Sequence, residues 1–164
     1  MTSTAESQRV VGKEINVEAL IKNIVDQQSG RYTTFMNLFA GGFQDTQLRM
    51  YRWLLHPVLT AKSEKLQAGF TYAELRKHLQ EHHPSGKALN PGNLTQALQY
   101  CSSLQVEKNI KAIVLDYDQT GLRLNIVDRG FIVWLEYQDK AELLEALDLD
   151  NPDEPTLPGF EAST

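Results

Sequence analysis

Residues 87–127 decide the fold, and they read KALNPGNLTQALQYCSSLQVEKNIKAIVLDYDQTGLRLNIV. The first part of this stretch predicts a helix over residues 91–104. Asn90 is a favourable N-cap, and Pro91 suits the first helical position, where its missing N–H costs no hydrogen bond. Apolar residues recur at helical spacing, at Leu94, Ala97, Leu98, Cys101 and Leu104. We therefore expect a helix that buries one face.

The opposite face of this helix is polar but uncharged. It carries Gly92, Gln96, Gln99 and Ser103, flanked by Thr95 and Tyr100. Glutamine and asparagine side chains pair bidentately with adenine in the major groove of DNA. Because the solvent face of a helix usually carries charged residues, we expect this uncharged face to approach a partner.

A two-stranded ribbon is predicted directly after the helix. Residues 111–117 and 122–127 are rich in apolar and β-branched side chains, which favour strands. Residues 118–121 form the expected hairpin turn, in which Gly121 would supply a positive φ. Upstream, Thr71 and Glu74 have the spacing of a capping box that opens a helix over residues 72–81. Downstream, Asp128 is placed to cap a further helix.

This order of elements resembles a winged helix-turn-helix domain over residues 70–135. The resemblance implies a mostly α (α+β) fold in which helix 91–104 is the recognition helix, with two added N-terminal helices and a C-terminal helix. The expected organisation is a disordered N-terminus, a pair of N-terminal helices, the winged domain with its C-terminal helix, and an acidic disordered tail, over residues 1–15, 16–44, 45–147 and 148–164.

The N-terminal helices are predicted at residues 16–25 and 32–40, separated by a break near Gly30. A third helix is expected to begin at a cap on Asp45 and to end before Pro57. The added helices could cover the open face of the winged domain, or they could form a homodimer contact. For the dimer contact the candidate residues are Val17, Leu20, Ile21 and Ile24.

The formal net charge of −5 is unevenly distributed along the chain. Residues 135–164 contain nine acidic residues and a single basic one, Lys140. Residues 46–111 contain nine basic and four acidic residues, together with all four histidines. The predicted DNA-facing part is thus basic and the tail acidic, although a modest basic patch is also ordinary surface composition. The polar N-terminus lacks the apolar core of a signal peptide, and a cytoplasmic location is expected.

Motifs that would carry catalysis were not found, so the chain is not expected to be an enzyme, and no cofactor is predicted. The single cysteine, Cys101, lies on the buried stripe and is expected to be an inert core residue. His78 and His82 have the i, i+4 spacing of a metal clamp. A metal site also needs a third ligand. The remaining candidate, His56, is expected in a turn far from this helix. We therefore predict no metal site.

Two functions remain. The first is a dimeric transcriptional regulator that reads duplex DNA. The resemblance places one group of side chains near base edges, namely Asn93, Thr95, Gln96, Gln99 and Tyr100. It places another group at phosphates, namely Arg76, Lys77, Lys87 and Arg123. The wing departs from the usual pattern, because Asp116 and Asp118 are acidic where phosphate contact favours Lys or Arg. The alternative is a non-catalytic winged-helix adaptor that binds a protein partner through the winged domain or the acidic tail, within a larger ATPase or chromosome-organising assembly.

Overall fold

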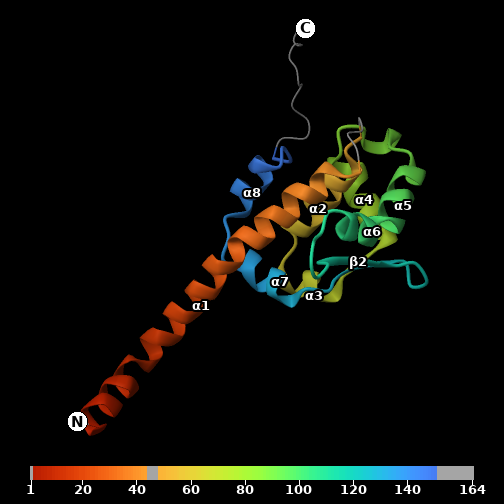
Figure 1. Ribbon diagram of the computed structural model, residues 1–164. Helices are drawn as coiled ribbons and strands as arrows, with labels where there is room; N and C mark the ends of the chain where they lie inside the picture. Colours follow the sequence, from red (N-terminus) through yellow and green to blue (C-terminus); the bar gives the residue numbers. More distant parts are fainter. Residues whose placement is uncertain (1, 44–47, 151–164) are drawn as a thin grey trace.

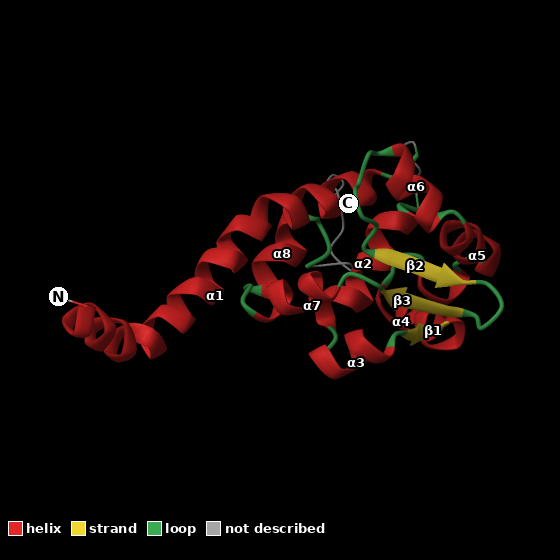
Figure 2. Cartoon of the chain, turned by 60° about the horizontal axis from the view of Figure 1, so that its bottom comes forward, coloured by secondary structure: helices red, strands yellow, loops and turns green. Residues whose placement is uncertain are grey.

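The computed structural model describes residues 2–43 and 48–150, with side chains from Asn16 onward. The chain is mostly helical and carries one small antiparallel sheet of three strands, which agrees with the expected α+β class (Figures 1 and 2). The elements in order are α1 (Thr2–Gly41), α2 (Met50–Thr60), α3 (Ser63–Ala68), β1 (Phe70–Thr71), α4 (Tyr72–His82), the 3-10 turn η1 (Gly86–Ala88), α5 (Pro91–Gln99), α6 (Cys101–Glu107), β2 (Leu115–Asp118), β3 (Arg123–Ile126), α7 (Arg129–Glu136) and α8 (Lys140–Ala146).

Helix α1 is continuous over 40 residues, so the prediction of two separate N-terminal helices is wrong. Gly30 does not interrupt it, because one glycine costs a helix only about 1 kcal/mol and the flanking turns pack well. The helix also includes residues 2–15, where a disordered terminus was expected. The first half of α1 stands clear of the other elements, and the second half lies along the body of the molecule (Figure 1).

Aromatic packing fixes the second half of α1 to α7. Tyr32 and Phe35 contact the ring of Phe131 at centroid distances of 5.2 and 5.5 Å. The N-cap of α7, Asp128, forms an ion pair with Arg31 at 2.7 Å and accepts a hydrogen bond from the Tyr32 hydroxyl at 3.1 Å. The predicted cap at Asp128 is confirmed, and it also joins two distant parts of the chain.

Helix α2 differs from its prediction at both ends. It begins at Met50, with Arg49 at its N-cap position; the predicted cap, Asp45, lies outside the described residues. Pro57 lies inside the helix instead of beyond it. A helix tolerates an interior proline only when tertiary packing offsets a lost hydrogen bond, and α2 is almost wholly buried between Trp53 and Leu59.

The strands are shorter than predicted, and their order in the sheet is β1-β3-β2. Residues 111–114 are not in a strand. Where β2 begins, the buried side chain of Gln105 accepts hydrogen bonds from the backbone N–H groups of Val114 and Leu115. The hairpin turn forms as expected, but the residue with positive φ is Leu122, at 53°, and not Gly121. Tyr117 pairs with Leu124 in the antiparallel register.

The predicted helix over residues 91–104 is two helices. Its start is confirmed: Asn90 accepts a hydrogen bond from the Gly92 N–H at 2.8 Å, and Pro91 is the first helical residue. Tyr100, at φ −103° and ψ 7°, ends α5 and precedes α6. Because the apolar stripe continues through Cys101 and Leu104, periodicity alone did not reveal the break.

The chain remains packed beyond α8. Leu149 is fully buried, and its N–H donates to the Leu144 carbonyl at 2.7 Å. Arg52 donates to the carbonyl of Leu147 at 2.9 Å. The predicted tail boundary at residue 148 is therefore too early; residues 151–164 lie outside the described part. Throughout the described chain, no helix is both long enough and apolar enough to cross a membrane.

Candidate functional site

The uncharged face of α5 is exposed as predicted for its central residues. Gln96, Gln99 and Tyr100 are exposed, whereas Asn93 and Thr95 are half-buried. The Thr95 hydroxyl donates to the Pro91 carbonyl at 3.1 Å and lies 3.0 Å from the hydroxyl of Tyr72 in α4. Thr95 thus holds α5 against α4, and the free polar surface of α5 consists mainly of its glutamines.

A pocket of about 560 Å³ lies beside this face, where the end of α1 and the start of α2 approach α5 and α6. Its walls combine aromatic, aliphatic and polar side chains, namely Phe43, Leu48, Met50, Tyr51, Asn93, Gln96, Ala97, Tyr100 and Ser103. The Phe43 ring meets the ring of Tyr51 at 5.8 Å and that of Tyr100 at 6.4 Å. The predicted base-contact residues are therefore divided: Asn93, Gln96 and Tyr100 line the pocket, whereas Thr95 and Gln99 do not.

The predicted phosphate-contact residues also differ from one another. Arg76, Lys77 and Lys87 are exposed. Arg123 is half-buried, and its guanidinium donates to the Ala68 carbonyl at 3.0 Å, so it fastens β3 to the end of α3.

The two acids of the β2–β3 hairpin, Asp116 and Asp118, have structural partners. The Ser102 hydroxyl donates to Asp116 at 2.9 Å, which ties α6 to β2. Asp118 accepts a hydrogen bond from the Thr120 N–H at 3.0 Å within the hairpin turn. These contacts explain why acidic residues stand at this place in the ribbon.

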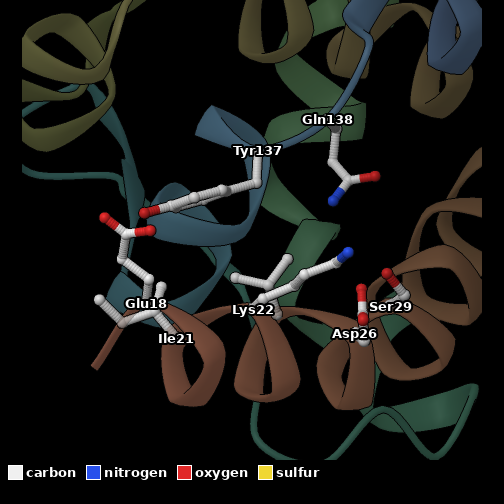
Figure 3. A pocket seen from close by; sticks show the side chains of 8 residues that line it. Glu18, Ile21, Lys22, Asp26, Ser29, Tyr137 and Gln138 are labelled. Carbon is white, nitrogen blue, oxygen red and sulfur yellow. The ribbon is translucent and has the colours of Figure 1, made fainter. Parts of the chain in front are cut away.

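The aliphatic stripe of α1 is unburied within the chain. Val17, Leu20, Ile21 and Ile24 retain exposures of 49, 58, 37 and 48%. Ile21 also borders a groove of about 580 Å³ between α1 and the segment after α7. Figure 3 shows Tyr137 and Gln138 facing the α1 side chains Glu18, Ile21 and Lys22 across this groove.

Three histidines meet between α2 and α4. The Nδ1 atom of His56 lies 2.7 Å from Nε2 of His78, and Nδ1 of His82 lies 2.8 Å from the carbonyl oxygen of His78. The premise that His56 is held in a distant turn is wrong, because His56 lies in α2, which packs directly on α4. His83 lies apart from this cluster, with Nε2 2.7 Å from the Leu48 carbonyl.

The environment of the cluster favours uncharged imidazoles. Burial, followed by the proximity of His78 and His82, lowers the pKa of His56 to about 4. Burial, followed by the proximity of His82, lowers the pKa of His78 to about 4, against an opposing effect of Glu81. Both side chains are therefore neutral at pH 7, with a lone pair available on one ring nitrogen.

The sequence did not predict that His56 lies beside the other histidines, or that Gln105 is buried and hydrogen-bonded to the backbone of residues 114 and 115. It also did not predict that the rings of Phe43 and Tyr51 line the pocket beside α5. The i, i+4 spacing of His78 and His82 was the available signal for the first. A polar residue on the apolar side of a helix was the signal for Gln105, which is fully buried. Comparisons of the chain with protein-family models, with curated proteins and with solved structures find no match.

Proposed function

We propose that this chain is a winged helix-turn-helix protein that binds duplex DNA as a dimer, with α5 directed into the major groove. The observation that carries the proposal is the exposed amide face of α5. Gln96 and Gln99 are exposed on a helix whose nine residues include no acid or base. Amide side chains can form paired hydrogen bonds with the edges of DNA bases. Because they carry no charge, the attraction to phosphate must come from other elements.

The arrangement of the other elements supports this proposal. Helix α2, strand β1, helix α4, helix α5 and the β2–β3 hairpin come in winged-helix order, with α3, η1 and α6 between them. The capping box predicted at Thr71 is present: the Glu74 N–H donates to the Thr71 hydroxyl at 3.1 Å, and the Thr71 N–H donates to the Glu74 carboxylate at 2.8 Å. It fixes the start of α4 directly after β1. The sheet order β1-β3-β2 brings the hairpin beside this junction.

In this proposal, exposed basic side chains near α5 contact the phosphates. Arg76 and Lys77 lie on α4, and Lys87 lies in η1, three residues before the cap of α5. Because Arg123 is already engaged with the Ala68 carbonyl, we assign the wing a minor part in binding. Phosphate contacts of this kind fix register on the duplex without reading sequence.

Dimerisation is assigned to the aliphatic stripe of α1 that begins at Val17. This stripe is exposed, and part of it borders the groove beside Tyr137, so it is available to a second copy of the chain. Two DNA-reading helices joined in this way would address two half-sites of one operator.

The test begins with selection of a preferred duplex from a random library and continues with three alanine variants. We expect Gln96→Ala and Gln99→Ala to weaken binding to the selected duplex by about 1–3 kcal/mol while binding to random duplex changes little. Gln67→Ala, an exposed glutamine on α3, is the matched control. Equal losses on selected and random DNA would contradict base reading by α5.

A second candidate function is a protein-binding adaptor, which the aromatic pocket beside α5 favours. Phe43, Tyr51 and Tyr100 offer the aromatic surface that is enriched at protein interfaces. Absence of duplex binding at about 50 mM salt, where phosphate attraction is strong, would favour the adaptor. Phe43→Ala would then weaken capture of a protein partner, whereas it would leave DNA binding unchanged if the first proposal holds.

A further inference from the structure

The three histidines between α2 and α4 form an arrangement that neither DNA binding nor the adaptor role explains. Each offers a ring nitrogen, and these atoms all lie within 4.8 Å of one another. We propose that His56, His78 and His82 bind one divalent transition-metal ion, with Zn²⁺ as the preferred occupant. Imidazole nitrogen is among the ligands that zinc favours, and three protein ligands with an open fourth position for water are a known zinc arrangement.

The two helices supply the ligands in complementary ways. His78 and His82 lie one turn apart on α4, at the i, i+4 spacing that places two imidazoles on one helix face. His56 comes from the buried side of α2, 22 residues earlier in the chain than His78. A bound ion would therefore cross-link two helices whose contact is part of the folded core.

The separations between the nitrogens are close to those that zinc requires. With Zn–N distances of about 2.0–2.1 Å, two ligands of a tetrahedral ion lie about 3.3 Å apart. The His56 and His78 nitrogens, at 2.7 Å, would open by roughly half an ångström to accept the ion. The remaining separations, at most 4.8 Å, would close by side-chain rotation.

The backbone already orients one of the ligands. Nδ1 of His82 lies 2.8 Å from the His78 carbonyl oxygen and donates its proton to it, which leaves Nε2 as the atom that His82 offers. Metal-binding histidines characteristically donate their second N–H to such an acceptor, because this fixes the tautomer and the ring orientation.

The histidine cluster is shielded from solvent on the α2 side and accessible to solvent on the α4 side. His56 is only 5% exposed and packs against the ring of Trp53 at 5.4 Å. His78 and His82 are half-buried, so solvent reaches the site from the α4 side. An ion thus has an entry path and a fourth position that water can fill.

A direct N–H···N hydrogen bond between His56 and His78 is the competing account of the cluster. It uses one nitrogen from each of these two residues and leaves Nε2 of His82 without a role. The two accounts differ in an observable way, because only the metal site requires all three residues for saturable binding.

The first experiment uses the untagged full-length chain, stripped with a chelator, and titrates it with Co²⁺ as a spectroscopic substitute for zinc. We expect visible absorption bands of tetrahedral Co²⁺ that saturate at one ion per chain and disappear when Zn²⁺ is added. Zinc at 100 times its dissociation constant should raise Tm by about 5–10 °C. Absence of saturable bands, together with an unchanged Tm, would overturn the proposal.

Variants separate the site from incidental binding. His82→Ala should weaken zinc binding by at least about 100-fold, since it removes a ligand and not merely an outer hydrogen bond, and it should abolish the rise in Tm. Gln80→Ala, which lies between the two ligands on α4, is the matched control and should bind like the wild type. If circular dichroism shows that His82→Ala is unfolded, His82→Gln serves in its place. Folded His82 variants that bind zinc like the control would overturn the proposal.

Discussion

The two halves of α1 carry similar apolar patterns but meet different surroundings. In the second half, Tyr32 and Phe35 are each 1% exposed and pack on α7, and Phe39 is fully buried. In the first half, the aliphatic stripe that begins at Val17 and includes Leu20 remains between 37 and 58% exposed. Both halves have the amphipathic spacing that predicts a buried face.

This difference shows what helical periodicity does and does not specify. The spacing of apolar residues determines which side of a helix is suited to burial, but not which surface will cover it. For the second half of α1 the covering surface is formed mainly by α2 and α7 of the same chain. For the first half the covering surface proposed above is another copy of α1. The contrast predicts opposite consequences for equivalent substitutions.

The largest effect is expected for Phe35→Ala. Removal of this ring empties a fully packed site between Phe39 and Phe131, and the free energy of unfolding should fall by about 3–5 kcal/mol. Urea unfolding at low protein concentration measures it. The matched change in the first half, Leu20→Ala, should alter this free energy by less than about 0.5 kcal/mol. Similar losses for the two variants would remove the contrast between the halves.

A smaller loss is expected for Leu149→Ala, which tests whether the core extends beyond α8. Leu149 is fully buried but lies in the short segment after α8, so the loss should be about 2 kcal/mol, at the low end for a buried leucine. A truncation after Asp150 is the control, and it should unfold like the full chain. If the truncation destabilises the protein as strongly as Leu149→Ala does, residues beyond 150 contribute to the core.

Asp128 forms the polar contacts that hold the second half of α1 to α7. Its removal should lower the free energy of unfolding by a still smaller amount. Asp128→Ala deletes the cap of α7, the ion pair with Arg31 and the acceptor for the Tyr32 hydroxyl. We expect a loss of about 1–2 kcal/mol in thermal or urea unfolding. Asp128→Asn retains a capping oxygen and should lose less. Equal losses would show that charge, and not capping, accounts for the role of Asp128.

The smallest effect on stability, but a change of oligomeric state, is expected for Ile21→Glu. A charge placed in an apolar dimer contact must be desolvated, so the dimer should dissociate while the monomer stays folded. Light scattering measures the mass, and Asn23→Glu, which adds the same charge away from the stripe, is the control. A wild-type chain that is already monomeric at tens of micromolar would exclude α1 as a dimer contact.

Features that depend on neighbouring residues were predictable from the sequence. The cap at Asn90 with Pro91 after it, the capping box at Thr71, and the cap at Asp128 all form as expected. In each case a side-chain oxygen reaches a backbone N–H two or three residues away, so the chemistry is complete within one turn of the chain. The burial of Cys101 also follows from its place on the apolar stripe.

Features that depend on distant contacts were not predictable from local patterns. Pro57 predicts the end of a helix, yet it lies inside α2. The tertiary packing of the buried helix offsets the hydrogen bond that the proline removes. The break at Tyr100 leaves the apolar stripe intact, so no change of period marks it. Leu149 lies within the acidic segment that was predicted to be a disordered tail, yet it is fully buried.

The candidate sites divide in the same way. The sequence by itself determined the uncharged face of α5 and the pairing of His78 with His82 on one side of α4, because the helical repeat sets which residues share a face. Only the tertiary structure decided that His56 joins that pair and that aromatic rings from α2 and from the segment just after α1 lie beside α5. The physical reason is that packing between helices is governed by the shape and burial of whole surfaces, and a local pattern does not contain them.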